Sequence, residues 1–269
     1  MRSITLATAW HPRGELARFI KLLQLLNETY TGIAVSLPPE VDQEIEYELG
    51  RIPEVIPVVT EDWSWGRFSA MEKSLAFEAA QVQYADFDRL LRWVETRPGE
   101  WLATLARADR SDCLIIGRTQ SAYDSHPQAL VQTEAISNRL VSHLLGFGFE
   151  VDVSAGSKIF SGEAARYLIE NCRPPAPVGA GHALGTDAEW PVTLKRAGFN
   201  LDYAEVDGLD WESADQSLHR AANVEDQRKA AEEYDADPRN WARRVAVALE
   251  IVQIGLDAAQ TEIHRELRE

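Results

Sequence analysis

"GRFSAMEKSLAFEAAQVQYADFD", the stretch from Gly66 to Asp88, carries the order of features that decides the fold. Its first half places apolar residues three or four positions apart, as an amphipathic helix does: Phe68, Met71, Leu75 and Ala79. Its second half, "VQYADFD", is a β-rich apolar run that ends in two aspartates. A helix followed at once by a buried strand is the repeating unit of an α/β protein, so this stretch predicts a strand with two carboxylates at its carboxyl end.

The two carboxylates, Asp86 and Asp88, are two positions apart. On a strand both side chains point to one side of the sheet, and two like charges that close destabilise each other unless a cation neutralises them. Divalent Mg²⁺ or Mn²⁺ accepts carboxylate oxygens and leaves coordination positions for phosphate oxygens. Pairs of this kind also occur by chance, so an ordinary charged turn at the edge of a sheet is the alternative.

Strands and helices alternate on both sides of this stretch, which predicts an α/β fold with a mixed, mostly parallel sheet flanked by helices. We expect strands at 3–10, 32–36, 54–62, 82–88 and 111–119, a strand with a loop at 149–161, and helices at 14–28, 66–80, 90–108, 126–146 and 162–171. Pro38-Pro39 should end the second strand, and Pro98 should divide the third helix. Ligands of such sheets bind beyond the carboxyl ends of the strands, which is where Asp86 and Asp88 are expected.

The last third of the chain does not continue the alternation of strands and helices. "RPPAPVGAGHALG" is either a surface loop or a mobile loop over a site, and 186–206 holds a helix and a strand. From 213 onward nearly every segment is helical, with an apolar stripe that either packs on the sheet domain or makes a homodimer contact: Val245, Ala248, Val252 and Leu256.

Composition restricts the class of partner. A net charge of −16 over 269 residues argues against nucleic acid, because phosphate backbones are bound by clustered Lys and Arg. The two cysteines form no C-x-x-C, which argues against a zinc knuckle or a disulfide framework. The first residues lack an apolar signal-peptide core, and no run approaches the length of a transmembrane helix, so we expect a cytoplasmic protein with no transmembrane segment.

Further motifs follow the stretch in a fixed order: "RPGEWLATL", "LIIGRTQ", "VDVSAGSKIFSGEAA" and "GTDAEWPVTLKRAGFNLDYAEV". In this order, from Ser3 to Val206, the chain resembles the GT-A glycosyltransferases, especially their large inverting family. The resemblance implies a Rossmann-like GT-A catalytic domain over 1–212, with a nucleotide-binding half at about 1–118 and an acceptor half at about 119–212. Residues 213–269 would then form a helical C-terminal extension.

The resemblance also implies roles for the acidic residues. Asp88 looks like the ligand of the Mn²⁺ or Mg²⁺ ion that bridges the two phosphates of the donor. Asp86 looks like the residue that reaches the ribose, or the metal through water. Asp187 resembles the general base that deprotonates the acceptor hydroxyl, with Glu189 as the competing candidate. The alternative is that Thr186 or Asp187 only caps the helix that begins there.

Basic residues provide the other candidates. His219 resembles the third metal ligand that several GT-A enzymes use, although a lone histidine is more often a surface residue; His182 is a weaker case. Arg118 could approach a phosphate or form a salt bridge, and Arg67 and Lys158 are similar, weaker cases.

The nucleobase pocket departs from the family pattern. The family usually has an acidic pair after the second strand, whereas this chain has "SLPPE" there, with only Glu40 and Asp42 available. Thr8 and Ala9, at the end of the first strand, are expected near the base or the ribose. Trp10 and His11 are unusual in that position, and the simplest interpretation is a packed aromatic ring and an exposed histidine.

Together these features predict a metal-dependent glycosyltransferase. It would move a sugar from a nucleotide-diphosphate sugar, a GDP- or UDP-sugar, to a hydroxyl of a sugar, small-molecule or carrier-bound acceptor. The Q-x-x-R-W element of processive membrane synthases is missing. The alternative is a non-catalytic GT-A-like protein that binds a nucleotide or sugar or serves in assembly. A nucleotidyltransferase is disfavoured, because "TAWHPRGE" is not the Gly-rich loop that such enzymes carry after the first strand.

Overall fold

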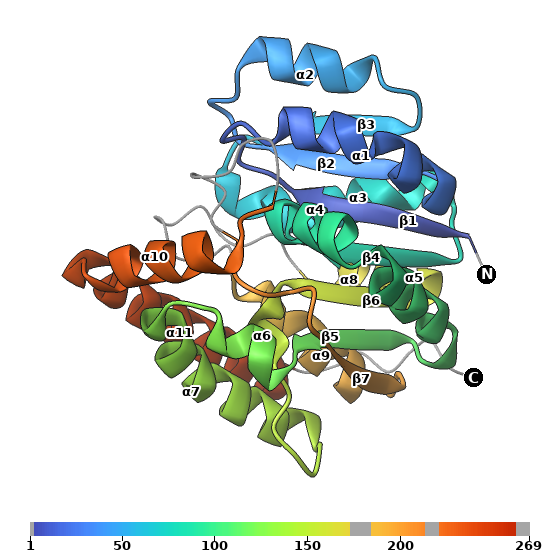
Figure 1. Cartoon of the computed structure of the whole chain (residues 1–269). Helices are drawn as coiled ribbons and strands as arrows, with labels where there is room; N and C mark the ends of the chain where they lie inside the picture. Colours follow the sequence, from blue (N-terminus) through green and yellow to red (C-terminus); the bar gives the residue numbers. More distant parts are fainter. Residues whose placement is uncertain (1–2, 173–183, 213–220, 262–269) are drawn as a thin grey trace, which may run out of the picture.

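Seven strands form one mixed sheet at the centre of the computed structural model, which describes residues 3–172, 184–212 and 221–261 (Figure 1). The strand order is β3-β2-β1-β4-β6-β5-β7. All neighbours are parallel except β6, which runs antiparallel to both β4 and β5. The mixed, mostly parallel sheet is therefore confirmed. Its strands are β1 (Ile4–Ala9), β2 (Ile33–Leu37), β3 (Val55–Val59), β4 (Gln81–Ala85), β5 (Cys113–Arg118), β6 (Ser157–Ser161) and β7 (Leu201–Val206).

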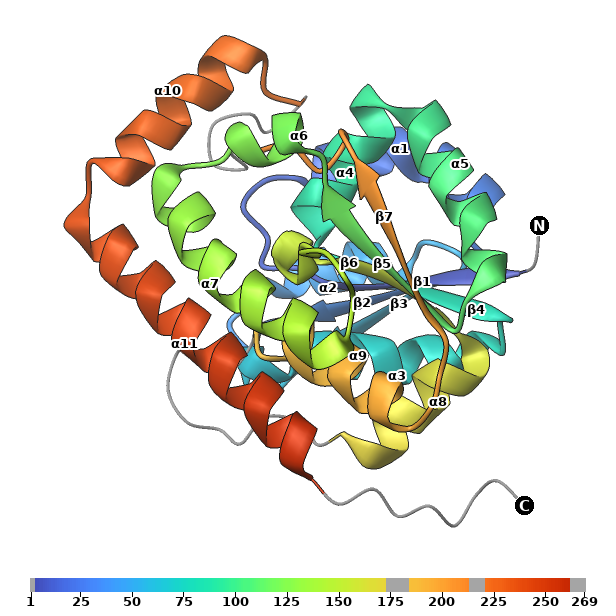
Figure 2. The ribbon, with the colours of Figure 1, turned by 90° about the horizontal axis from the view of Figure 1, so that it is seen from below.

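Helices cover both faces of the sheet, as Figure 2 shows from below. One face carries α1 (Leu16–Thr29), α4 (Phe87–Thr96) and α5 (Pro98–Arg107), and the other carries α3 (Gly66–Ser74), α8 (Gly162–Asn171) and α9 (Thr186–Arg196). Each face has its own apolar core, with Trp93 and Trp101 on the first and Trp190 and Phe160 on the second. The remaining helices are α2 (Gln43–Gly50), α6 (Gln120–Asp124), α7 (Gln128–Leu145), α10 (Val224–Asp235) and α11 (Pro238–Gln260).

The strand order reverses beside β1. The chain proceeds outward from β1 through β2 to β3, then returns to place β4 on the other side of β1. At such a switch point the connections after adjacent strands leave in opposite directions and open a crevice at the carboxyl ends. The fold therefore positions a ligand site at the ends of β1, β2 and β4.

The end of β4 differs from the prediction. The strand stops at Ala85, Asp86 is the N-cap residue of α4, and Asp88 lies in the first turn of that helix. The reason is Phe87, which is 1% exposed and packs its ring 4.8 Å from that of Trp10. Burial of this ring turns the chain into the helix, and acidic side chains are favoured at a helix N-terminus. The two carboxylates therefore do not share one face of a strand, which corrects the sequence prediction.

Other boundaries are confirmed or corrected in detail. Pro98 is the first residue of α5, as predicted, because its fixed φ and missing N–H suit that position. The helix expected to reach residue 80 ends at Ser74 and continues only as a 3₁₀ turn, after which Glu78 adopts a left-handed φ of 50°. Helix α2 was not predicted at all. Only the last five residues of the range 149–161 form a strand.

The C-terminal helix α11 packs against α7 and α9. Its buried side chains are Val247, Ala248, Ile251 and Ala258, whereas Val245 is 47% exposed, so the buried face is rotated from the predicted stripe. Within the described residues, no helix combines the length and the apolar character that crossing a membrane requires.

Candidate functional site

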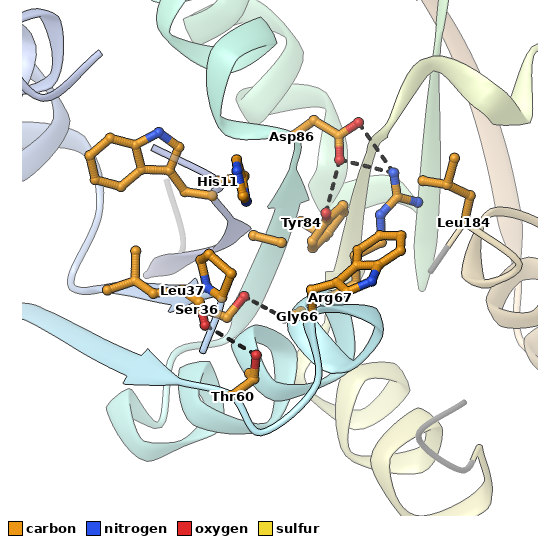
Figure 3. A pocket seen from close by; sticks show the side chains of 13 residues that line it. His11, Ser36, Leu37, Thr60, Gly66, Arg67, Tyr84, Asp86 and Leu184 are labelled. Carbon is orange, nitrogen blue, oxygen red and sulfur yellow. Dashed lines mark hydrogen bonds and ion pairs between the residues drawn. The ribbon is translucent and has the colours of Figure 1, made fainter. Parts of the chain in front are cut away.

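A cavity of about 200 Å³ opens at the carboxyl ends of β1, β2 and β4, where the strand order reverses (Figure 3). Its walls come from these strand ends, from the segment after β3 and from the first turn of α3. The lining residues are Ala9, Trp10, His11, Ser36, Leu37, Pro38, Thr60, Trp63, Gly66, Arg67, Tyr84, Asp86 and Leu184.

Close packing holds the first turn of α3 at the cavity. The Ser36 hydroxyl donates to the Gly66 carbonyl at 2.6 Å. A Cβ atom on Gly66 would lie 3.1 Å from that hydroxyl oxygen and 3.3 Å from the Ala9 Cβ, so a larger residue would push the helix outward. This contact brings the next residue, Arg67, to the cavity wall.

Arg67 binds the carboxylate at the end of β4. Its Nη2 donates to both oxygens of Asp86, at 3.0 and 3.2 Å, and its guanidinium lies 5.3 Å from the centre of the Tyr84 ring (Figure 3). The Tyr84 hydroxyl donates to the same Asp86 carboxylate at 2.9 Å. Arg67 therefore supplies a positive charge next to Asp86, where the sequence predicted a metal ion.

The same arginine also binds Asp187. Arg67 Nη1 lies 2.9 Å from Asp187 Oδ2, and Lys158 Nζ donates to Asp187 Oδ1 at 2.8 Å. We name the row Lys158–Asp187–Arg67–Asp86, with its alternating charges, the charge chain. The side chains of Lys158 and Asp187 are 1% and 5% exposed, whereas that of Asp86 is 25% exposed, so Asp86 is the open end of the charge chain.

The two cations of the charge chain, Arg67 and Lys158, determine the protonation state of Asp187. Burial alone would raise the pKa of this carboxyl, but the charges of Arg67 and Lys158 outweigh burial and lower the pKa below its ordinary value. Both oxygens are engaged by cations, and the N-cap residue of α9 is Gly185, with no side-chain cap. In this structure Asp187 is neither a free base nor a helix cap.

Glu189 lies on a different side of α9. Two residues along a helix correspond to a rotation of roughly 200° about its axis, so Glu189 faces away from Arg67. Burial, and secondarily the charge of Glu189, raise the pKa of Cys172, the residue that follows α8. Burial raises the pKa of Glu189 to about 7. The structure thus separates the two predicted candidates for the general base.

Replacement of Glu189 by glutamine is expected to change the pH dependence of stability. The pKa of Glu189 rises from 4.5 to about 7 on folding, so the folded protein binds this proton more tightly than the unfolded chain does. The stability that the bound proton contributes is fully present below about pH 4.5 and is lost as the pH rises through 7. Glu189→Gln removes this loss, and we expect the variant to be more stable than the native protein at pH 8 by about 1–3 kcal/mol. Unfolding midpoints measured from pH 4 to 9 test this, with the exposed α8 residue in Glu170→Gln as control. Parallel curves for native protein and Glu189→Gln would contradict it.

Asp88 is the carboxylate that remains for a metal. It accepts the Arg89 backbone N–H at 2.8 Å, and in the described part of the chain it forms no ion pair. Burial raises its pKa, and the nearby Asp86 charge adds to this, against the opposing charges of Arg89 and Arg13. A cation at this position would offset the burial of the Asp88 carboxylate, which Arg89 and Arg13 offset only in part.

The donor set fits a divalent ion that completes its coordination with phosphate. Mg²⁺ and similar hard ions bind one or two protein carboxylates and take further oxygens from water or a substrate phosphate. Asp88, with Asp86 beside it, supplies that number of carboxylates. Residues 3–172, 184–212 and 221–261 contain no group of three His, Cys, Asp or Glu side chains able to hold a metal. His219 and His182, two other candidates, lie outside these ranges.

Some predicted nucleotide-binding residues line the cavity and others do not. Ala9 and Arg67 do. The side chain of Thr8 is fully buried and donates its hydroxyl to the Ala85 carbonyl at 2.7 Å, so it joins β1 to β4 and does not reach the cavity. Glu40 is exposed outside the cavity, with Oε1 3.8 Å from Nδ1 of His11.

Arg118 lies at the carboxyl end of β5, away from the cavity lining, in a fully buried ion-pair network. Its Nε and Nη2 donate to Asp152 at 2.6 and 2.9 Å, and Nη2 donates to Glu134 at 2.6 Å. The guanidinium also lies 4.5 Å from the centre of the Tyr123 ring. Burial alone would lower the pKa of Arg118, but the two carboxylates raise it. This geometry corresponds to the salt bridge that the sequence left open, not to a phosphate contact.

Several cavity residues were not predicted from the sequence, among them Tyr84, Trp63 and Thr60, and neither was one neighbour of Asp86. Tyr84 could have been found, because a residue two positions before Asp86 on a strand points to the same side. Trp63 and Thr60 carry no comparable signal, since their loop is placed by pairing of β3 with β2. The neighbour, Gly156, packs its backbone against the Asp86 carboxylate.

No family model matches the chain, and no curated protein matches it in sequence. Solved structures do resemble it. Glucosyl-3-phosphoglycerate synthase of M. tuberculosis is 15% identical, with a TM-score of 0.54, and the match covers 98% of this chain and 82% of that one. The same protein in complex with Mn²⁺, uridine diphosphate and phosphoglyceric acid matches at 15% identity with a TM-score of 0.51, over 98% of this chain and 80% of that one. At this identity the likeness concerns the fold alone, and it shows that the chain has the GT-A fold that its motif order predicted.

Proposed function

We propose that the chain is a metal-dependent glycosyltransferase that moves a sugar from a nucleotide-diphosphate sugar to an acceptor hydroxyl. The observation that carries this proposal is the cavity at the switch point of a GT-A sheet, with the open end of the charge chain in its wall. Donor sites of open α/β sheets lie at this position.

The neutral part of the cavity suits a nucleoside. Trp63 is 42% exposed and lines the cavity together with His11, so planar rings are available for stacking on a base. The hydroxyls of Ser36 and Thr60 donate to backbone carbonyls, which leaves their oxygen lone pairs to accept from a base N–H. These groups would serve in place of the acidic pair that the family pattern has after the second strand.

The charged end suits a diphosphate. Asp88, assisted by Asp86, would hold the Mn²⁺ or Mg²⁺ ion. When bound, such an ion neutralises the diphosphate leaving group as a Lewis acid. Arg67 would bind and orient the donor while it stays paired with Asp86, and its five N–H groups allow both contacts.

The acceptor hydroxyl needs a proton acceptor. We propose that Asp187 acts mainly through Arg67, because both of its oxygens are bound by cations. A general-base role for Asp187 requires that the bound donor first draw Arg67 away from it. Glu189, on another side of α9, would serve as the base only after a change in the position of that helix.

The neighbouring structures guide the choice of donors and acceptors to test. One holds Mn²⁺ and uridine diphosphate, and another holds UDP-glucose, which supports UDP-sugars as the first donors to test, with GDP-sugars as the alternative. Both hold phosphoglyceric acid. We propose a small or carrier-bound hydroxyl compound as the acceptor here. A cytoplasmic location and a homodimer remain predictions.

Thermal unfolding with UDP- and GDP-sugars, with and without Mn²⁺, tests the proposal. A donor at about 100 times its Kd stabilises the folded state by about 2.7 kcal/mol, which for a chain of this size raises Tm by roughly 5–10 °C. We expect this rise for the native protein only when Mn²⁺ is present, and we expect Asp88→Ala to abolish it.

The control is Glu225→Ala, which like Asp88→Ala removes an acid from the first turn of a helix, here the exposed start of α10. This variant should keep the full donor-induced rise. If no nucleotide sugar raises the Tm of the native protein, the proposed function is wrong. If the rise is the same without Mn²⁺, only the metal dependence is wrong.

The second candidate is a GT-A-like protein that binds a nucleotide sugar without transferring the sugar. The engagement of both Asp187 oxygens by cations favours it, because no free carboxylate is then positioned as a base. Release of uridine diphosphate from UDP-sugars, followed over hours, separates the two candidates. Donor-induced stabilisation without any release, with or without acceptors, supports the binding protein.

A further inference from the structure

Gly156 lies between the 3₁₀ turn Val153–Ala155 and strand β6, directly opposite the end of β4. Its carbonyl accepts the backbone N–H of Asp86 at 2.9 Å, which extends the pairing of β4 with β6 by one bond. Its φ is +73°, in the left-handed region that favours glycine. The backbone at Gly156 and the backbone at Asp86 are therefore held together.

The side chain of Asp86 occupies the space that a side chain at 156 would need. A Cβ atom on Gly156 would lie 2.2 Å from Asp86 Oδ2 and 2.7 Å from its Cγ, distances at which no two such atoms coexist. We propose that Gly156 is a positioning residue: by lacking a side chain, it fixes the Asp86 carboxylate against Arg67.

The segment around Gly156 also holds the neighbours of this carboxylate. The Ala155 carbonyl accepts from Arg89 Nη1 at 2.9 Å, and Arg89 follows Asp88. The Val153 carbonyl accepts from Lys158 Nζ at 3.0 Å, at the far end of the charge chain. One short segment, 153–156, thus fixes both ends of the charge chain and the residue next to Asp88.

Displacement of Asp86 would change the whole charge chain. Arg67 donates two of its hydrogen bonds to Asp86 and is otherwise bound to Asp187. Without Asp86 in place, the guanidinium is left with Asp187 as its charged partner and is drawn toward α9. The displaced Asp86 carboxylate would then lie in a different position in the cavity, without its cation.

A second glycine provides a matched control. Gly146, at the end of α7, has a φ of +71°, and a Cβ atom there would meet no atom within 4 Å. Both glycines therefore pay the same conformational cost when replaced by alanine, and only Gly156 has a carboxylate in the way. Any difference between the two alanine variants reports the contact with Asp86.

The test is a stability cycle that requires no ligand. Gly146→Ala is expected to lower Tm by about 2–6 °C, the cost of one alanine in the left-handed region. Gly156→Ala is expected to lower it at least twice as far. In an Asp86→Ala background the clash is absent, so Gly156→Ala should then cost no more than Gly146→Ala. Equal losses in the native background, or an unchanged excess in the Asp86→Ala background, would overturn the proposal.

Failure of the single variant to fold is also informative. If Gly156→Ala is insoluble, the Asp86→Ala/Gly156→Ala double variant should be recovered in folded form, and failure to recover it counts against the proposal. The role in donor binding rests on the proposed function and has its own readout: Gly156→Ala should lose the Mn²⁺-dependent donor shift, and Gly146→Ala should keep it. If the native protein shows no donor shift, the proposed function fails while the stability cycle still decides the role of Gly156.

Discussion

Replacement of Arg118 by methionine is expected to destabilise the protein by about 3–5 kcal/mol, a fall in Tm of roughly 10 °C. The side chain of Arg118 is fully buried between Asp152 and Glu134, whose side chains are 9% and 2% exposed. Methionine fills a similar volume but leaves Asp152 without its cation and leaves Glu134 with Arg244 alone. Burying an unpaired charge is among the most destabilising single changes known for a folded protein. Thermal or urea unfolding at pH 7 measures the loss.

Two comparisons isolate the cause of this loss. Arg228 pairs with Glu232 on the surface of α10, where the two side chains are 65% and 63% exposed, so Arg228→Met should cost less than about 1 kcal/mol. The double variant Arg118→Met/Asp152→Asn removes the carboxylate that lost its cation and keeps the Arg244–Glu134 pair, so it should recover much of the stability that Arg118→Met loses. If the double variant is no more stable than Arg118→Met, unpaired charge is not the cause.

The fold followed from the sequence because its signals are local. Apolar spacing identified α3, and Pro38-Pro39 and Pro98 marked the end of β2 and the start of α5. The end of β4 was misplaced, because "VQYADFD" has no local signal that distinguishes strand from helix at Phe87. Contact of that ring with Trp10 and Phe19, both more than 60 positions away in the chain, decides it.

Several residues of the candidate site could be predicted from the sequence, but the ion pairs between them could not. The motif order identified Asp86, Asp88 and Asp187 as site residues, and Arg67 was a weaker candidate. That Arg67 binds both Asp86 and Asp187 depends on the relative positions of α3, β4 and α9, which lie far apart in the chain. Arg118 shows the same limit. An arginine at this position of the chain could contact a phosphate or form a salt bridge, and the sequence alone does not distinguish the two.

The second large effect is expected for Arg67→Met, which should weaken donor binding at least about 30-fold, the equivalent of about 2 kcal/mol for loss of one partner of a buried charge pair. The variant leaves Asp86 without its cation at the cavity wall and leaves Asp187 with Lys158 alone. Asp86 would then repel the diphosphate that Arg67 is proposed to bind. Titration of UDP-sugar in the presence of Mn²⁺, followed by the rise in Tm, measures the loss.

Arg67→Lys separates charge from geometry in this prediction. Lysine keeps the positive charge but lacks the planar fork that reaches Asp86 with Nη2 and Asp187 with Nη1, so it can hold only one of them closely. We therefore expect donor affinity between those of the native protein and Arg67→Met. Arg51→Met, which removes an arginine that is 65% exposed, should bind donor as the native protein does. If Arg67→Met binds donor with native affinity, Arg67 holds the two carboxylates of the site in place but takes no part in recognising the donor.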